Sequence, residues 1–136
     1  MDVPLAVLAE AANVSRENTL NILGIFGVIR ASAFPARHPA AVLVIQLRAR
    51  PSERGQPVRV TIRMMDEDKV LAEIEGEFVI PSPEGSDDIR INQLFHLRML
   101  VLPKAGEYAF HILVNGDEKA TVPFRALEMP SQPAAK

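Results

Sequence analysis

Cysteine and tryptophan are both absent from this chain of 136 residues. The lack of cysteine excludes disulfide frameworks, thiolate metal sites and cysteine nucleophiles. One tyrosine and six phenylalanines are few for a protein that stacks sugars or single-stranded nucleic acids on aromatic platforms. The formal net charge of -2 gives no basic excess of the kind that attracts nucleic acids or anionic membranes. We therefore expect neither nucleic acid nor membrane as a partner.

Long apolar runs are also absent, since no stretch approaches the roughly 18 consecutive apolar residues of a membrane-spanning helix. The N-terminus does not resemble a signal peptide, because Asp2 stands where a positive charge is expected and Glu10 ends a short apolar stretch. These features favour a cytoplasmic location. The length and a hydrophobic content of 48% predict one folded domain at residues 1–128, followed by a disordered tail at 129–136.

Hydrophobic residues recur mainly with a period of two, which is typical of half-buried β-strands. Four segments alternate in this way: 58–64, 70–80, 89–101 and 108–114. Turn residues separate them at short intervals, and no long helical pattern is available to connect parallel strands. The sequence therefore predicts an all-β fold, an antiparallel β-sandwich of seven to eight strands with immunoglobulin-like or jelly-roll Greek-key topology.

Two further segments are apolar at both odd and even positions: residues 20–29 (LNILGIFGVI) and 40–47 (AAVLVIQL). Such runs suit strands that are covered on both faces, or strands whose outer face meets a partner. Gly24 and Gly27 argue against a helix in the first run and indicate a bulge or a close backbone approach. Residues 5–14 have helical propensity, but a first strand fits the architecture better.

The pairing of some strands follows from charge and parity. Segments 58–64 and 70–80 are expected to form a hairpin in which arginines face glutamates across the strands. Segments 89–101 and 108–114 are expected to pair next, with Leu102 opposite Glu107. The hairpin that follows needs an odd loop or a bulge, so Asn115–Gly116 is not expected to be a plain two-residue turn.

In that expected register Arg98 lies opposite His111, and His96 is a diagonal neighbour on the same outward face. His96, Arg98 and His111 are therefore a candidate binding site for a small ligand or a metal ion. The simpler interpretation is that they are scattered polar residues on a solvated face. The spacing of the histidines does not match a metal-ligand set, so we predict no resident metal.

Catalytic motifs are missing. There is no G-x-S-x-G elbow, no phosphate-binding loop of the G-x-x-x-x-G-K-[ST] type and no G-x-G-x-x-G turn. No serine has an assignable base. We therefore expect a protein that is not an enzyme and has no cofactor.

The surplus of apolar residues at outward positions favours an interaction or structural module, binding a protein partner or a second copy of itself. The candidate interface residues are Leu23, Ile25, Val42, Val44, Leu100 and Leu102. The alternative is that the N-terminal segment or a loop of the same chain covers this face.

Three segments together, LNILGIFGVIRA, FPARHPAAVLVIQLR and GEYAFHILVNG, resemble an uncharacterised family of small bacterial β-sandwich proteins. That family, a domain of unknown function, is marked by an LNILG strand and a GxYxFxIxVxG hairpin. The resemblance covers roughly residues 3–128. It implies a β-sandwich of unknown activity in the bacterial cytoplasm and supplies no catalytic residues.

Overall fold

The computed structural model describes residues 1–82, 85 and 87–130. Nine strands and one short 3-10 turn make up this part of the chain, and none of its helical residues forms a segment able to cross a membrane. The strands are β1 (Asp2–Val14), β2 (Leu20–Ile25), β3 (Val28–Ala31), β4 (Ala36–Ala49), β5 (Pro57–Asp66), β6 (Lys69–Val79), β7 (Ile89–Leu102), β8 (Gly106–Val114) and β9 (Asp117–Glu128), with the 3-10 turn η1 at Pro51–Glu53.

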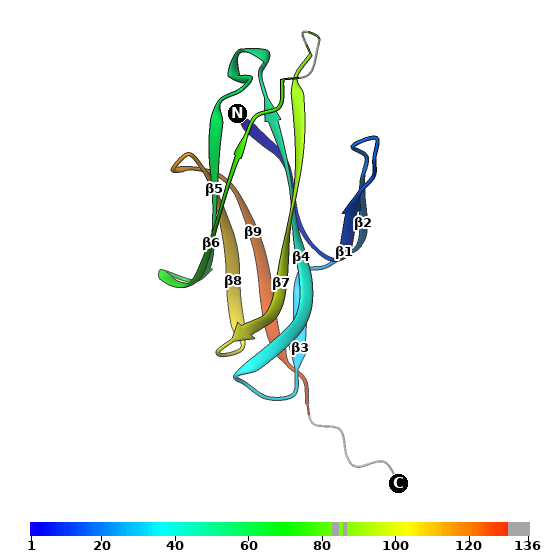
Figure 1. The fold of residues 1–136 in the computed structure, drawn as a ribbon. Coiled ribbons are helices and arrows are strands. Elements are labelled where there is room, and N and C mark those ends of the chain that lie inside the picture. Colours follow the sequence, from blue (N-terminus) through cyan, green and yellow to red (C-terminus); the bar gives the residue numbers. More distant parts are fainter. Residues whose placement is uncertain (83–84, 86, 131–136) are drawn as a thin grey trace.

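The strands form two sheets (Figure 1). The four-stranded sheet has the order β2-β1-β4-β7, and the five-stranded sheet has the order β3-β9-β8-β5-β6. The all-β expectation is confirmed, and residues 5–14 lie within strand β1. Of the expected tail, residues 131–136 lie outside the described residues.

Two expectations are wrong. The described residues form nine strands rather than seven to eight, and one pair of neighbouring strands is parallel. Residues 20–29 do not form one strand, because the chain leaves the four-stranded sheet after Ile25 and enters the other sheet at Val28. There β3 pairs with β9 in parallel, from Val28 opposite Arg125 to Ala31 opposite Glu128. All other neighbouring strands in the described residues are antiparallel. The crossing explains why this run is apolar at both parities.

The main core lies between the inner faces of the two sheets. Leu43, Ile45 and Leu47 point inward from β4, and they are fully buried. From the opposite sheet come Ile62, Ile112, Phe110 and Phe124, at even positions as the alternation predicts. Phe110 and Phe124 stack with their ring centroids 5.1 Å apart.

The charged hairpin is formed as expected. Strands β5 and β6 pair with Arg59 opposite Glu77 and Arg63 opposite Glu73. The guanidinium groups contact these carboxylates at 3.0 Å and 2.9 Å respectively. The outward face of this hairpin therefore neutralises its own charge, and ion pairs as exposed as these contribute little to stability.

The expected pairing of Leu102 with Glu107 is wrong. Strand β7 pairs with β4, whereas β8 pairs with β5 and β9, so the turn after Leu102 carries the chain from one sheet to the other. The hydroxyl of Tyr108 holds this corner by donating to the carbonyl of Lys104 at 2.5 Å and accepting from its amide at 3.2 Å. The alternation of hydrophobic residues along the chain is the same for a hairpin within one sheet and for a corner between two sheets.

The next hairpin contains the bulge that parity required. The register shifts between Ile112 and Leu113, so that Ile112 lies opposite Ala120 while Val114 lies opposite Asp117. The turn itself nevertheless has two residues, Asn115 and Gly116, both with positive φ. Asn-Gly suits this geometry because both residues tolerate the left-handed region.

Candidate binding groove between the edge strands

The interface expected at Val42 and Val44 is not exposed, because both side chains are buried. The β1–β2 hairpin folds over the outer face of β4, and Leu20 and Ile22 pack against the two valines in a second apolar cluster. The structure thus shows the alternative in which the N-terminal segment covers this face. A strand exposed on its outer side and a strand covered by its own chain have the same sequence pattern.

Side-chain hydrogen bonds hold the hairpin in place. At its tip, the amide group of Asn92 donates to the Asn18 side chain at 3.1 Å, and the Asn18 amide donates to the Arg90 carbonyl at 3.3 Å. At its base, Gly24 has a φ of 70° and a Cβ there would lie 2.8 Å from the Glu10 carboxyl carbon. The group that approaches Gly24 is therefore the Glu10 side chain rather than another backbone, and the positive φ is what favours glycine at this position.

Leu100 and Leu102 face the core rather than a partner. Leu102 is fully buried, and Leu100 packs against the core. Met99 has a φ of 51°, which breaks the alternation of β7 and turns Met99 and Val101 outward, with exposed fractions of 52% and 49%. The pairing opposite Met99 is interrupted at Pro39, which has no amide hydrogen to contribute.

Of the expected interface residues, only Leu23 and Ile25 remain strongly exposed, on β2. They point away from the apolar cluster that their neighbours Leu20 and Ile22 enter.

The candidate ligand site of His96, Arg98 and His111 is not assembled. His96 and Arg98 lie on β7 of the four-stranded sheet, whereas His111 lies on β8 of the other sheet. On that sheet His111 is hydrogen-bonded to Glu118, and this bond lowers the pKa of the glutamate. Among the described residues no three His, Asp or Glu side chains gather into a set able to hold a metal ion.

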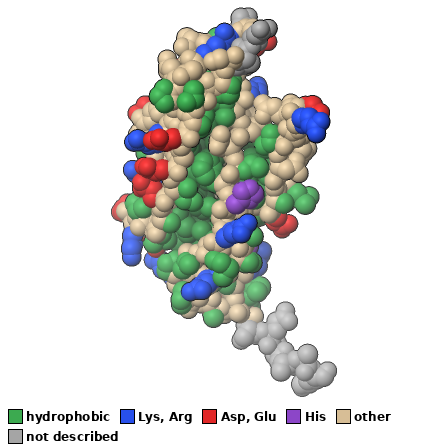
Figure 2. All heavy atoms as spheres, viewed as in Figure 1, with side chains coloured by type: hydrophobic (Ala, Val, Ile, Leu, Met, Phe, Trp, Pro, Cys, Tyr) green, Lys and Arg blue, Asp and Glu red, His purple; other side chains and the backbone are tan. Residues whose placement is uncertain are grey.

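An open groove lies between β6 and β7, the edge strands of the two sheets. It has a volume of about 540 Å³. Figure 2 shows hydrophobic side chains along this side of the molecule, bounded by charged ones. The residues that line the groove are Met64, Leu71, Ala72, Ile74, His96, Leu97, Arg98, Met99, Leu100 and Val101.

The floor of the groove is core surface that no strand covers. Ile74 lies opposite Ile62 in the β5–β6 register and therefore on the inward face of its sheet, yet 39% of it is exposed while Ile62 is buried. The groove closes further along β6, where Gly76 approaches the Phe95 ring. A Cβ at Gly76 would lie 3.7 Å from that ring, so the two strands meet there through side-chain contact.

The β7 side of the groove carries the two polar residues, His96 and Arg98. Within the part of the chain that the structure describes, the Arg98 guanidinium has no carboxylate within ion-pair distance. The same two side chains border a smaller hollow of about 220 Å³ lined by alanines and Glu10. An exposed guanidinium beside an apolar channel is well placed to bind a carboxylate.

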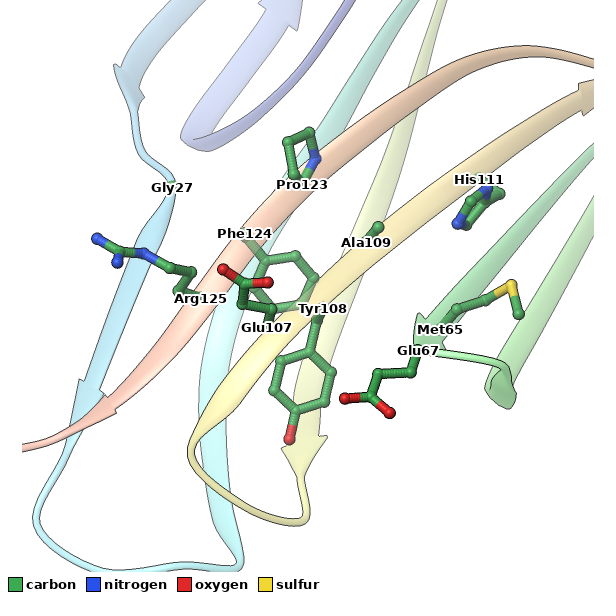
Figure 3. Close-up of a pocket in the computed structure, with 10 residues that line it drawn as sticks. All are labelled: Gly27, Met65, Glu67, Glu107, Tyr108, Ala109, His111, Pro123, Phe124 and Arg125. Atoms are coloured by element: carbon green, nitrogen blue, oxygen red, sulfur yellow. The ribbon is translucent and has the colours of Figure 1, made fainter.

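A second hollow, of about 480 Å³, lies on the outer face of the five-stranded sheet (Figure 3). Its lining includes three small residues, Ala109, Pro123 and Gly27. Glu107 and Arg125 lie opposite each other on β8 and β9 at one side, and His111 borders the other. The mixed charges of this lining indicate no single class of ligand.

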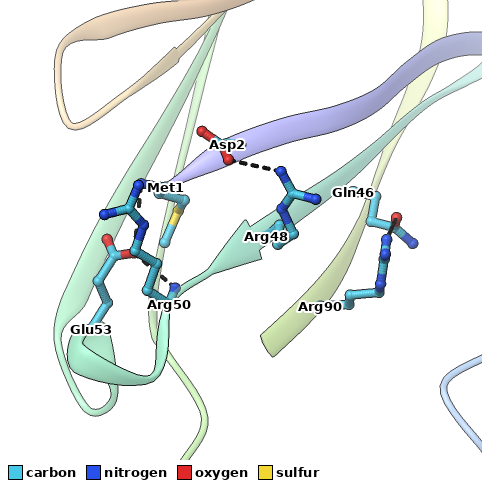
Figure 4. Close-up of polar contacts among 7 residues, drawn as sticks. All are labelled: Met1, Asp2, Gln46, Arg48, Arg50, Glu53 and Arg90. Atoms are coloured by element: carbon cyan, nitrogen blue, oxygen red, sulfur yellow. Dashed lines mark hydrogen bonds and ion pairs between the residues drawn. The ribbon is translucent and has the colours of Figure 1, made fainter. Parts of the chain in front are cut away.

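Polar contacts near the N-terminus engage the side chains of Arg48 and Arg90 (Figure 4). Arg48 contacts Asp2 at 3.0 Å, and this hydrogen bond lowers the pKa of Asp2. Arg90 donates to the Gln46 side chain at 2.8 Å. Glu53 accepts from the Arg50 backbone amide at 2.9 Å, which lowers its pKa, and contacts the N-terminal amine at 3.5 Å. The contacts of Asp2 and of the N-terminal amine fasten the start of β1.

Comparison with known proteins gives a family but no activity. No curated protein matches this chain. Among solved structures it is similar to the Pseudomonas fluorescens alkylpurine DNA glycosylase AlkC bound to DNA containing an abasic site analog, with 17% sequence identity and a TM-score of 0.42. That similarity covers 74% of this chain and 27% of the glycosylase, and carries no argument about fold or activity. Residues 4–127 match the family of unknown function DUF6941, and this chain therefore belongs to that family.

Proposed function

We propose that this protein is a non-catalytic interaction module that accepts an extended segment of a partner protein in the groove between β6 and β7. The observation that carries the proposal is the exposure of the inward-facing Ile74 beside an unpaired edge strand. A free edge supplies main-chain hydrogen bonds to an added strand, and pockets beside it select alternate side chains.

We further infer an immunoglobulin-like topology, on two supports. The orders β1-β4-β7 and β9-β8-β5 correspond to the A-B-E and G-F-C strands of that fold, with β6 added beside C. Tyr108, at the start of β8 and bonded to the backbone four residues upstream, corresponds to its tyrosine corner. In that fold strand D lies next to E, and the groove occupies the corresponding position beside β7.

The residues that line the groove indicate which kind of segment binds there. The occupant is an extended segment with alternating apolar residues, because Leu71, Ile74 and Leu97 line the channel. It also carries a carboxylate, because Arg98 borders the channel without an ion-pair partner in the described residues. Its main chain bonds to the free edge of β7.

Selection from a displayed library of linear peptides tests this proposal. We expect enriched peptides with alternating apolar residues and an acidic residue. Ile74→Asp and Ala72→Glu, both within the groove, are expected to weaken binding of the selected peptide by about tenfold or more, or about 1.4 kcal/mol. Val79→Asp is the matched control, because Val79 lies on the same strand, is 61% exposed and does not line the groove.

Unfolding curves for each variant establish that it is folded before binding is compared. The proposal is overturned if no peptide is enriched, or if Val79→Asp weakens binding as much as the groove variants do.

A further inference from the structure

The two faces of β7 differ in chemistry beside the groove. Leu97 lies opposite Ala41 of β4, and both residues belong to the main core between the sheets. His96 lies opposite Val42, which is buried in the second apolar cluster on the outer face of β4. Directly opposed residues of paired strands project from the same face of a sheet. Leu97 therefore projects from the inner face of β7, and His96 projects from the outer face.

Arg98 shares the outer face with His96, because side chains two residues apart in a strand project to the same side. It is exposed and lies opposite Ala40, which has only a methyl side chain. The alternation holds as far as Arg98 and is broken at Met99, where φ is positive. The cation of the groove is thus one position along the strand from the apolar side chain of Leu97, and it lies on the opposite face.

The charges around Arg98 leave its guanidinium free for a partner. On the outer face, Glu10 of β1 borders the same small hollow as Arg98, but the Glu10 side chain lies against Gly24. No ion pair joins Glu10 to Arg98 within the described ranges of the chain. In the sheet order β1 lies beyond β4, so a strand added at the free edge of β7 meets Arg98 from the side away from β1.

Resting on the proposed function of the groove, we infer that the partner segment has the order apolar–acidic–apolar, with its acidic residue opposite Arg98. In an added strand the residue opposite Leu97 faces the groove, and the residue opposite Arg98 faces outward. A shift of the segment by one residue exchanges these two faces and places the carboxylate in the apolar channel, where its burial is costly. The position of the carboxylate therefore sets the register of the segment.

Two peptides of identical composition test this position. One is a peptide selected from the linear library, and the other exchanges its acidic residue with the apolar residue beside it. We expect the exchanged peptide to bind more weakly by about tenfold or more, because no register satisfies both the groove and Arg98.

Charge reversal identifies the partner of the carboxylate. Arg98→Glu is expected to weaken binding of the selected peptide by about tenfold or more, and a peptide with lysine in place of its acidic residue is expected to restore it. Arg90→Glu is the control, because Arg90 projects from the same face of β7 and does not line the groove. Unfolding curves establish that both variants are folded.

Equal binding of the two peptides would overturn this inference, and so would a loss in Arg98→Glu that the lysine peptide does not reverse. Either result leaves the groove as a peptide site, since Ile74→Asp tests that separately. If no peptide is selected at all, the proposed function fails and this inference fails with it.

Discussion

At the scale of single residues, Met99 decides which side chains of β7 reach the core. Its φ of 51° places a non-glycine residue in the left-handed region, inside a strand. This conformation puts Leu100 and Leu102 inward and turns Met99 and Val101 outward, and three of these four residues, Met99, Leu100 and Val101, line the groove. The left-handed region costs an L-residue about 1–2 kcal/mol. The outline of the groove thus depends on one strained residue.

Substitution by glycine tests that strain. Met99→Gly and Val101→Gly are both expected to lower the free energy of unfolding. The loss for Met99→Gly is expected to be about 1 kcal/mol smaller than the loss for Val101→Gly, because glycine adopts positive φ without a steric cost. Val101 is the control, since it is equally exposed on the same strand and has no positive φ. Urea unfolding of both variants measures the difference. A larger loss for Met99→Gly would contradict this account of β7.

At the scale of elements, the β1–β2 hairpin acts as a cover for the outer face of β4. Its inner side, with Leu20 and Ile22, buries Val42 and Val44, and its outer side presents Leu23. Adjacent residues of one strand therefore have opposite environments.

Two neighbouring substitutions separate these environments. Ile22→Asp places a carboxylate in the apolar cluster and is expected to destabilise the protein by about 2–3 kcal/mol. Leu23→Asp is expected to cost less than about 0.5 kcal/mol, because its side chain stays in solvent. Thermal or urea unfolding compares them, and equal losses would show that the hairpin does not cover β4 as described.

The sequence predicts strand pairing correctly where opposite charges or the alternation of hydrophobic residues specify which residues face each other. The β5–β6 hairpin is predictable because Arg59 and Arg63 require Glu77 and Glu73 at matching positions. It fails where the chain changes sheets. The apolar run before Val28 has the same pattern in one covered strand as in a crossing, and the corner after Leu102 has the same alternation as a hairpin, so His111 was expected beside Arg98 and lies on the other sheet. The groove is formed by two strands that never pair, and no local pattern marks it.

At the scale of the whole molecule, three carboxyl groups among the described residues have a pKa below the ordinary value. The hydrogen bond from Arg48 lowers the pKa of Asp2, the backbone amide of Arg50 lowers that of Glu53, and His111 lowers that of Glu118. A group with a lowered folded-state pKa binds fewer protons when folded than when unfolded, so stability falls as the pH falls.

We therefore expect the urea midpoint to fall progressively as the pH drops below the ordinary carboxyl pKa values of 3.8 and 4.5. Well above these values, these groups are expected to leave the midpoint independent of pH. Glu53→Gln is expected to make the acid limb shallower, since it removes one of the three groups. Midpoints measured between neutral pH and pH 3 test this. An unchanged acid limb in Glu53→Gln would contradict the assignment.

The central claim is that a partner strand adds to β7. Amide hydrogen exchange of the protein, alone and with a peptide selected from the linear library, tests this claim most directly. We predict new protection at alternate amides in the groove-lining part of β7, from His96 to Val101, with little change on β2 or on the outer face of the five-stranded sheet. Protection confined to β2 or to that outer face, or binding that leaves the β7 amides unprotected, would contradict it.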